Sequence, residues 1–231
     1  MTRPPSSLLH YLLLLTFYSL LLSSCSPATP TAAPEPITVQ YSAAAQPWLS
    51  AVYDCAGKTP IFANQRAVQY FDPSADIAIR LGEPEQLRTP AFEIGIEEIL
   101  VIVHPQNHVT EIGVTEVREL FTGRIRNWSQ LGGPDASVRV WIYAPGEDIQ
   151  RIFEAAVMQG GTVTSLAQLA TSPDEMYQAI ADDVNAIGIL PRSWKVENVQ
   201  EVYVAATVPV LAIIPSEEQG VTADLLACLQ K

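Results

Sequence analysis

The feature that most constrains this fold is an alternation of short, β-branched apolar runs with segments that have helical apolar spacing. Continuous apolar runs are typical of strands buried on both faces, and their alternation with helices predicts an α/β domain. The sequence contains no internal repeat of fixed period. The predicted strands are 37–40, 75–79, 99–103, 138–142, 186–190, 202–205 and 208–214.

Two helix starts have recognisable signals. Ser172 to Glu175 forms a capping box with proline at the first helical position. Further upstream, Thr115 is expected to cap a helix whose first turn carries Glu116. Gly123 is expected to end that helix. Its apolar stripe consists of Val117, Leu120 and Phe121.

The N-terminal segment predicts export. Leu8 to Leu22 is apolar and uncharged, follows a single basic residue, Arg3, and is short for a membrane span of roughly 20 residues. The tetrad ending at Cys25, L-S-S-C, resembles a bacterial lipobox, in which the cysteine is lipidated after cleavage. We therefore expect a lipoprotein signal peptide at 1–24, and a lipidated Cys25 with a Pro-rich tether at 25–36. The alternative is an uncleaved N-terminal anchor with an incidental cysteine.

The charge of the chain disfavours nucleic acid as a partner. Without Arg3, 12 basic side chains face 25 acidic ones, so the mature chain carries about −13. An acidic surface of this kind favours solubility and opposes long-range steering of anions.

A resemblance to a known family comes from the segment 104–133. It contains an Asn loop, a helix ending in F-x-G, and then N-W-x-x-L-G-G from Asn127 to Gly133. This order resembles the phosphate-type solute-binding proteins of ABC transporters. Read from the residues alone, Trp128 is a buried aromatic at a scaffold corner that holds the helix against a sheet.

The resemblance implies a two-lobe, type II periplasmic-binding-protein-like fold with mixed sheets flanked by helices. Lobe 1 would comprise 37–103 plus 199–231, and lobe 2 would comprise 104–198. The lobes would close on a small solute, phosphate or another oxyanion, delivered to an ABC permease. The protein would be a monomer without cofactor or enzymatic activity, extracytoplasmic and held on the bacterial cell membrane by its N-terminal lipid.

In lobe 1, the resemblance implies ligand donors at the turn 41–47. Ser42 keeps a hydroxyl there, whereas Ala43 stands where a small hydroxyl residue is expected. Asp76 matches the family's A-D-I segment, whose Asp accepts a proton from the ligand, but an Asp also satisfies strand ends. Arg80 would supply charge near the cleft or lie on the surface.

In lobe 2, the family motif R-x-x-x-S-G-T aligns with Tyr143 to Ile149, and none of its key residues is kept. Tyr143 replaces the arginine, while Glu147, Asp148 and Ile149 replace Ser-Gly-Thr. Two carboxylates at a helix start cap it themselves and repel an anion. They would be either plain caps or recognition groups for a cationic or polyhydroxy ligand, so phosphate binding of the usual kind is not expected.

Cys55 and Cys228 remain as an even pair once Cys25 is lipidated, and an oxidising compartment favours a disulfide between them. The two-lobe topology supports this pairing because it places both chain ends in one lobe. Two separately buried thiols are the alternative.

Other chemistry has little support in the sequence. His104 and His108 are four apart, but Pro105 argues against one helical face and no third metal ligand is evident. The motifs G-x-S-x-G, Walker A and G-x-G-x-x-G are absent. The rival hypothesis is a sensory or protein-interaction lipoprotein on the same fold, supported by the lost Ser-Gly-Thr motif.

Overall fold

The computed structural model describes residues 35–195, 197–215 and 220–231. Residues 35–231 form one compact unit. The predicted signal peptide, Cys25 and the tether up to residue 34 lie outside the described residues. Within the described ranges, no helix combines the length and apolarity that a membrane crossing requires.

The described strands form one mixed sheet in the order β2-β1-β3-β8-β4-β7-β5-β6. β1 pairs in parallel with β2 and β3, and β5 pairs in parallel with β6 and β7, whereas β8 runs antiparallel to β3 and β4. The strands are β1 (Ile37–Tyr41), β2 (Ile61–Gln65), β3 (Ile77–Leu81), β4 (Ala91–Val103), β5 (Arg139–Tyr143), β6 (Gln168–Ala170), β7 (Ala186–Pro191) and β8 (Gln200–Ile213).

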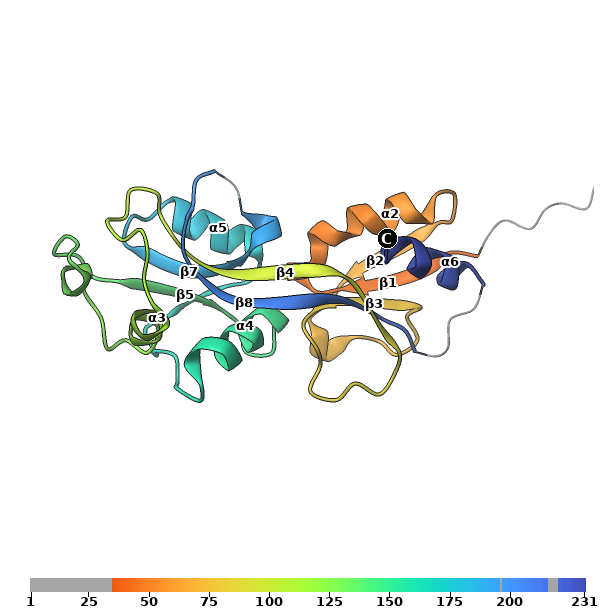
Figure 1. Ribbon diagram of the computed structural model, residues 1–231, viewed down its shortest axis with the longest axis horizontal. Coiled ribbons are helices and arrows are strands. Elements are labelled where there is room, and N and C mark those ends of the chain that lie inside the picture. Colours follow the sequence, from red (N-terminus) through yellow and green to blue (C-terminus); the bar gives the residue numbers. More distant parts are fainter. Residues whose placement is uncertain (1–34, 196, 216–219) are drawn as a thin grey trace, which may run out of the picture. The chain divides into compact units, whose positions relative to one another are not determined.

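Two long strands, β4 and β8, form an antiparallel ribbon with one group of elements at each end (Figure 1). At one end, β3 pairs with the last residues of β8, and this first group contains β1, β2 and β3. At the other end, β7 pairs with Ile99–Val103 of β4, and this second group contains β5, β6 and β7. By this strand pairing, Ile99–Val103 belongs to the second group.

Helices cover both groups. The first group carries α2 (Leu49–Ala56) and α6 (Gly220–Leu229). In the second group, α5 (Pro173–Ala181) lies on one side of the strands, and α3 (Val114–Phe121) and α4 (Asp148–Phe153) lie on the other (Figure 1). A π-helical turn, η4 (Glu154–Met158), continues α4, and short 3₁₀ helices are η1 (Ala43–Trp48), η2 (Val68–Tyr70), η3 (Trp128–Leu131) and η5 (Arg192–Trp194).

The helix starts match the sequence at one of the two sites. The Ser172 hydroxyl accepts a hydrogen bond from the Glu175 amide, as expected. The Glu175 carboxylate accepts from the Thr171 amide and hydroxyl and not from the Ser172 amide, so only half of the predicted capping box forms. Helix α3 instead begins after Gly113, whose amide donates to the Glu116 carboxylate, so Thr115 lies inside the first turn and does not cap it. Trp128 is buried, and its indole N–H donates to the Asn185 carbonyl at 3.1 Å, which supports the scaffold interpretation.

The strand predictions differ from the structure in two ways. The predicted segments 202–205 and 208–214 lie on the single strand β8, which continues through Thr207 and ends at Ile213. No apolar run in the sequence predicts β2, β6 or the first half of β4. Burial alternates or is weak in these segments, so their residues do not form continuous apolar runs.

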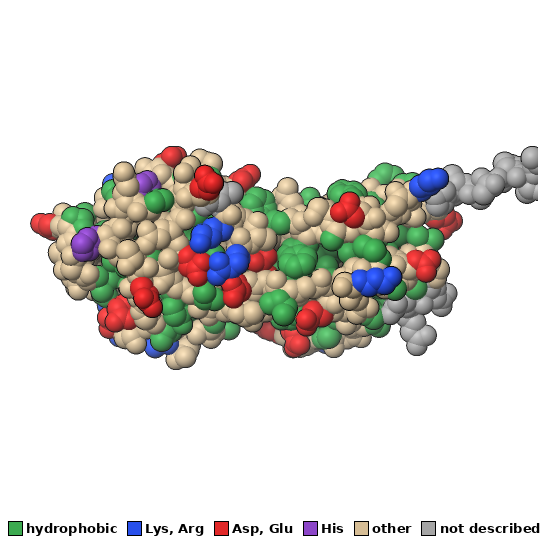
Figure 2. Space-filling model, turned by 45° about the horizontal axis from the view of Figure 1, so that its top comes forward, with side chains coloured by type: hydrophobic (Ala, Val, Ile, Leu, Met, Phe, Trp, Pro, Cys, Tyr) green, Lys and Arg blue, Asp and Glu red, His purple; other side chains and the backbone are tan. Residues whose placement is uncertain are grey.

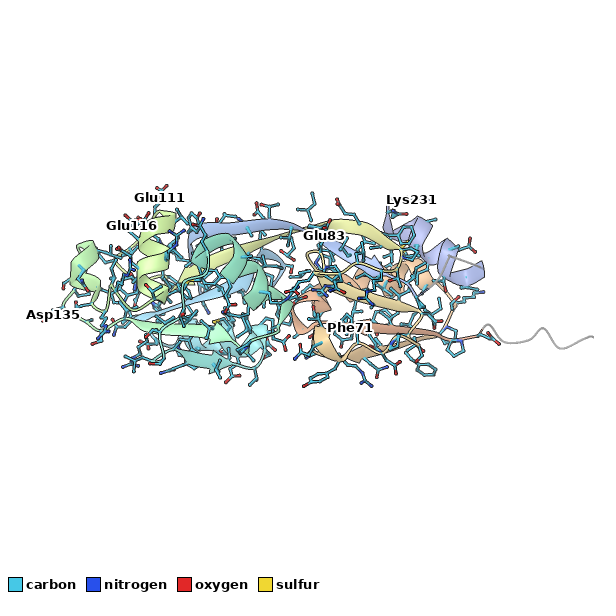
Figure 3. All side chains as sticks on the ribbon, turned by 90° about the horizontal axis from the view of Figure 1, so that it is seen from below. Phe71, Glu83, Glu111, Glu116, Asp135 and Lys231 are labelled. Atoms are coloured by element: carbon cyan, nitrogen blue, oxygen red, sulfur yellow. A yellow bond between two sulfur atoms is a disulfide. The ribbon has the colours of Figure 1, made fainter. Side chains whose placement is uncertain are left out.

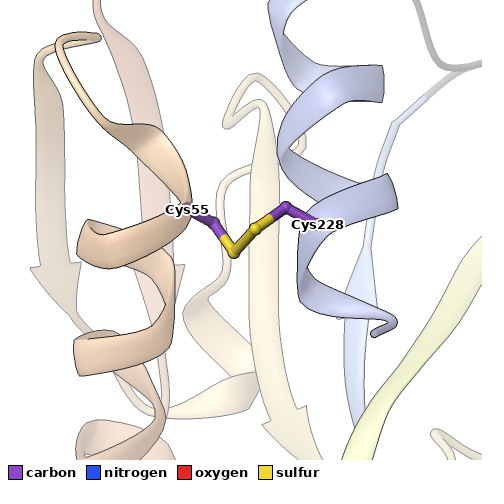
Figure 4. The surroundings of a disulfide bond; sticks show 2 residues. All are labelled: Cys55 and Cys228. Carbon is purple, nitrogen blue, oxygen red and sulfur yellow. A yellow bond between two sulfur atoms is a disulfide. The ribbon is translucent and has the colours of Figure 1, made fainter.

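A disulfide joins Cys55 on α2 to Cys228 on α6 (Figure 4). The bond confirms the predicted pairing. It ties the C-terminal helix to the first helix of the same group, across a sequence separation of 173 residues.

Candidate functional site

The candidate site lies where the carboxyl ends of β1 and β3 meet the start of α4. The two strands run parallel, so Ser42, directly after β1, and Leu81, the last residue of β3, come to the same edge. Helix α4 follows β5 of the second group. The site therefore joins residues from both groups.

Asp148 occupies the centre of this site. Its Oδ2 accepts a hydrogen bond from the Ser42 hydroxyl at 2.6 Å and another from the Leu81 amide at 2.9 Å. Its Oδ1 accepts one from the Ile149 amide at 2.9 Å, at the start of its own helix. Asp148 and Ser42 both have 0% exposed surface. Bonds to a carboxylate in such surroundings are short and strong, so the carboxylate itself takes the donors that a bound anion would use.

Arg80 supplies a buried positive charge next to this carboxylate. Its side chain is 7% exposed, and its Nε and Nη2 have no hydrogen-bond partner among the described residues. Burial lowers the pKa of the guanidinium, Asp148 opposes that shift, and Arg151 adds to it. Asp148 thus balances the charge of Arg80 without accepting a hydrogen bond from these two nitrogens.

Two more predicted site residues surround Asp148. Burial, together with the charges of Asp148 and Glu147, raises the pKa of Tyr143 well above its usual range, and its hydroxyl has no partner among the described residues. Burial and the Asp148 charge also raise the pKa of Glu147. Glu147 precedes α4, but its side chain makes no capping hydrogen bond, and the Ile149 amide in the first turn donates to Asp148 instead.

The remaining predicted residues contribute little to this site. Asp76 accepts a hydrogen bond from the Thr38 amide at 2.7 Å, just before β3, at the opposite end of the strand from Leu81. It therefore satisfies a strand end. Ala43 starts η1 and offers no side-chain donor, while Ile149 is a buried apolar residue.

A second set of contacts joins the two groups near the middle of the ribbon. The Trp48 indole N–H donates to the buried Glu97 carboxylate at 3.2 Å, and the Ser193 amide donates to its other oxygen at 3.2 Å. The Trp194 indole N–H donates to the Ala44 carbonyl at 3.1 Å. The two groups are thus held together by the protein's own donors and acceptors at several points.

Sequence reasoning missed the Leu81 amide and the Trp48–Glu97 contact. A backbone donor leaves no signal in residue identity, and no spacing links Trp48 to Glu97. The only available signal was the acidic Glu97 within an apolar stretch, which is typical of a buried carboxylate with specific partners.

Metal-binding groups are sparse in the part of the chain that the structure describes. No cluster of three or more His, Cys, Asp or Glu residues there could hold a metal ion. His104 Nδ1 instead accepts a hydrogen bond from the Gln106 amide at 3.0 Å.

On the face in Figure 2, acidic side chains are spread over both groups and basic ones are fewer. Among the described surface residues, Arg192 pairs with both Glu98 and Glu201.

Comparison with known proteins matches this architecture. A phosphate ABC transporter substrate-binding protein from Clostridium perfringens, solved with bound phosphate, aligns with a TM-score of 0.75 at 19% identity, over 84% of this chain and 92% of that one. An ABC-type phosphate transport receptor from Vibrio cholerae aligns with a TM-score of 0.66 at 19% identity, over 84% and 93% of the chains. At these identities the likeness shows the fold alone.

A curated relative agrees over a shorter segment. The phosphate-binding protein PstS of Bacillus subtilis is 26% identical over 102 residues, which cover 44% of this chain and 34% of that protein. The match thus spans about a third of that relative's length. The family model described as PBP superfamily domain matches residues 85–225, more than half of the 231-residue chain. The chain therefore belongs to the PBP superfamily domain family, and it has the substrate-binding fold seen in phosphate-binding proteins.

Proposed function

We propose that this protein is an extracytoplasmic solute-binding lipoprotein that serves an ABC permease, with an anion site that does not take inorganic phosphate in the usual way. The fold and the family support the solute-binding role. The observation that carries the altered specificity is the Asp148 carboxylate on the Ser42 and Leu81 donors.

Phosphate would have to displace this carboxylate or approach it closely. Two like charges about 4 Å apart repel by about 4 kcal/mol at the effective dielectric constant near a protein surface, and phosphate carries up to two charges. Displacement would also break three hydrogen bonds of a buried carboxylate. The wild-type site therefore disfavours phosphate by a wide margin.

Movement between lobes would take place in the ribbon. Strand β3 of the first group pairs with β8 only from Val210 onward, and strand β7 of the second group pairs with β4 only from Ile99 onward. We therefore place the hinge in the segments 95–98 and 207–209, with lobe 1 at the β1 to β3 end and lobe 2 at the β5 to β7 end. Small-angle scattering of the wild type and Asp148→Ala tests this hinge, since an unchanged radius of gyration after loss of the Asp148 contacts would argue against movement between the lobes.

A second candidate is a sensory or protein-interaction lipoprotein on the same fold. Asp148 and Trp194 already connect the two groups without a solute. A protein joined in this way can present a constant surface to a partner. Deleting the gene separates the candidates, because loss of uptake of a solute supports transport, whereas unchanged uptake with altered gene expression supports sensing.

The lipid anchor has its own test. Metabolic labelling with an alkyne fatty acid should mark the wild type, and Cys25→Ala should abolish the label and release the protein from the membrane. A labelled Cys25→Ala variant would overturn the anchor.

The phosphate specificity is tested on the purified wild-type protein. Calorimetric titration of phosphate should give no heat of binding, and tight binding would overturn the altered specificity.

A further inference from the structure

We infer that a cavity in the first group, beside Arg80, binds an organic monoanion whose carboxylate meets Arg80 and whose body is apolar. The inference rests on the proposed solute-binding function and names the class of solute. It concerns a place separate from the Asp148 contacts, because its walls come from the first group and the adjoining end of β8.

The cavity has a volume of about 450 Å³. Its walls are formed by the segment that leads into β3, by one side of β3, by the loop between β3 and β4, and by the end of β8. Apolar side chains dominate them, among them Phe71, Leu87 and Ile213. Phe71, labelled in Figure 3, lies with the first group, far from Glu111, Glu116 and Asp135 at the outer end of the second group. Cavities of this size hold small organic molecules.

Arg80 is the charged residue in these walls that is most deeply buried. Side chains alternate along β3, so Ala78 and Arg80 leave the strand on the cavity side, whereas Ile77, Ile79 and Leu81 leave it on the opposite side. Two nitrogens of the guanidinium lack partners among the described residues. Leaving buried donors of a cation unpaired is costly, which indicates that an acceptor is missing.

Nearby carboxylates do not fill this role. Asp148 already accepts three hydrogen bonds elsewhere. Asp72, at the cavity wall, is turned toward Ser74, whose amide and hydroxyl donate to it at 2.9 and 2.8 Å. An external carboxylate matches the planar fork of a guanidinium and would supply the missing acceptors.

The apolar walls decide what carries that carboxylate. A hydrated inorganic oxyanion would gain nothing from Phe71 and Ile213, whereas an aromatic or branched aliphatic body would bury its surface against them. Arg88, also in the wall, adds a second positive charge for a monoanion. The Nε and Nη2 atoms of Arg80 are themselves shielded from solvent. The proposal therefore includes a rotation of the Arg80 side chain that brings these atoms to the cavity.

The test uses benzoate as the probe, with benzamide as its neutral match and inorganic phosphate as the oxyanion without an apolar body. Calorimetry on the full chain in detergent should detect benzoate and give at least tenfold weaker binding of benzamide and of phosphate. Equal affinity for benzoate and benzamide, or no benzoate binding at millimolar concentration, would overturn the inference.

Variants locate the site. Arg80→Gln should weaken benzoate binding at least tenfold. Arg80→Gln could also disturb the fold, so Leu87→Glu supplies an independent test: Leu87 is 48% exposed, and a carboxylate there repels benzoate at the cavity. Glu85→Gln, exposed on the same loop and outside the cavity wall, should leave affinity unchanged. Unaltered benzoate binding in folded Leu87→Glu would place the probe elsewhere.

The inference and the proposed function fail in different ways. If benzoate binds through Arg80 but gene deletion leaves uptake of all small carboxylates intact, the results support the binding site beside Arg80 and contradict the transport role. If uptake of another solute depends on the gene while benzoate does not bind, the transport role stands and the cavity falls.

Discussion

Replacing Asp148 with alanine should destabilise the protein strongly. The change leaves the Ser42 hydroxyl and the Leu81 amide without their acceptor in a buried site, at about 1–3 kcal/mol each. It also removes the negative charge that balances buried Arg80, and breaking such a charge arrangement costs about 3–5 kcal/mol. These terms overlap, so we expect a loss of about 3–5 kcal/mol in the free energy of unfolding. For a chain of this size, the corresponding fall in Tm is roughly 6–20 °C.

The vacated site should then accept an anion. Ser42, Leu81 and Ile149 keep their donors, and Arg80 keeps its charge, so phosphate at about 100 times its Kd should return about 2.7 kcal/mol to the variant. Differential scanning calorimetry at fixed pH and salt should show this rescue in Asp148→Ala and none in the wild type. The exposed Asp54→Ala serves as the matched control and should show neither effect. A variant as stable as the wild type, or equal phosphate responses in both, would refute the reasoning.

Four other changes have definite expected outcomes. Tyr143→Phe removes a buried hydroxyl that has no partner among the described residues and should stabilise the protein by about 1 kcal/mol in urea unfolding; a loss of stability would mean that the hydroxyl is paired. Gly95→Ala should destabilise it, since the new Cβ would lie 2.2 Å from the Trp48 ring; unchanged Tm would contradict this packing. Folding raises the pKa of Glu147, so its ionisation costs stability as the pH rises above the usual carboxylate pKa. Glu147→Gln should therefore be more stable than the wild type at pH 7, by less than about 1 kcal/mol because the side chain is partly exposed, and equally stable in acid. A gain in stability that persists below about pH 4 would contradict this sign. Reducing the disulfide should lower stability by up to about 5 kcal/mol, and two alkylatable thiols in the native exported protein would show that it does not form.

The sequence predicted the buried strands well because their physics is local. The run Ile99–Val103 has no exposed surface, and its apolar character alone indicates a strand covered on both faces. The first half of β4 contains Glu93, Glu97 and Glu98, which break the apolar pattern. Glu97 is nevertheless buried, because partners far away in the sequence satisfy its carboxylate. Such compensation is invisible until the chain is folded.

The candidate site, too, could be predicted from the sequence only in part. The loss of Ser-Gly-Thr at residues 147–149 was evident from the residues and pointed to a changed anion site. That Asp148 would reach across to Ser42 and Leu81 depends on the packing of α4 against the ends of β1 and β3. Asp76 was assigned from a three-residue motif, but strand direction places it at the opposite end of β3 from Leu81. A short motif identifies a residue by its type, but it does not tell at which end of a strand that residue lies in the folded protein.

An internal carboxylate also changes what solute binding can do to this fold. A solute shifts a conformational equilibrium only by the difference in its affinity for the two states. Asp148 already makes bonds in the joined state that a solute bridging both groups would otherwise make. A solute that bridges the two groups therefore has little left to gain from closure. The cavity beside Arg80 belongs to the first group and the end of β8, so an occupant there can bind while the Asp148 contacts persist. Binding of benzoate with an unchanged scattering radius in the wild type, and a larger radius for unliganded Asp148→Ala, would be the combined signature of this arrangement.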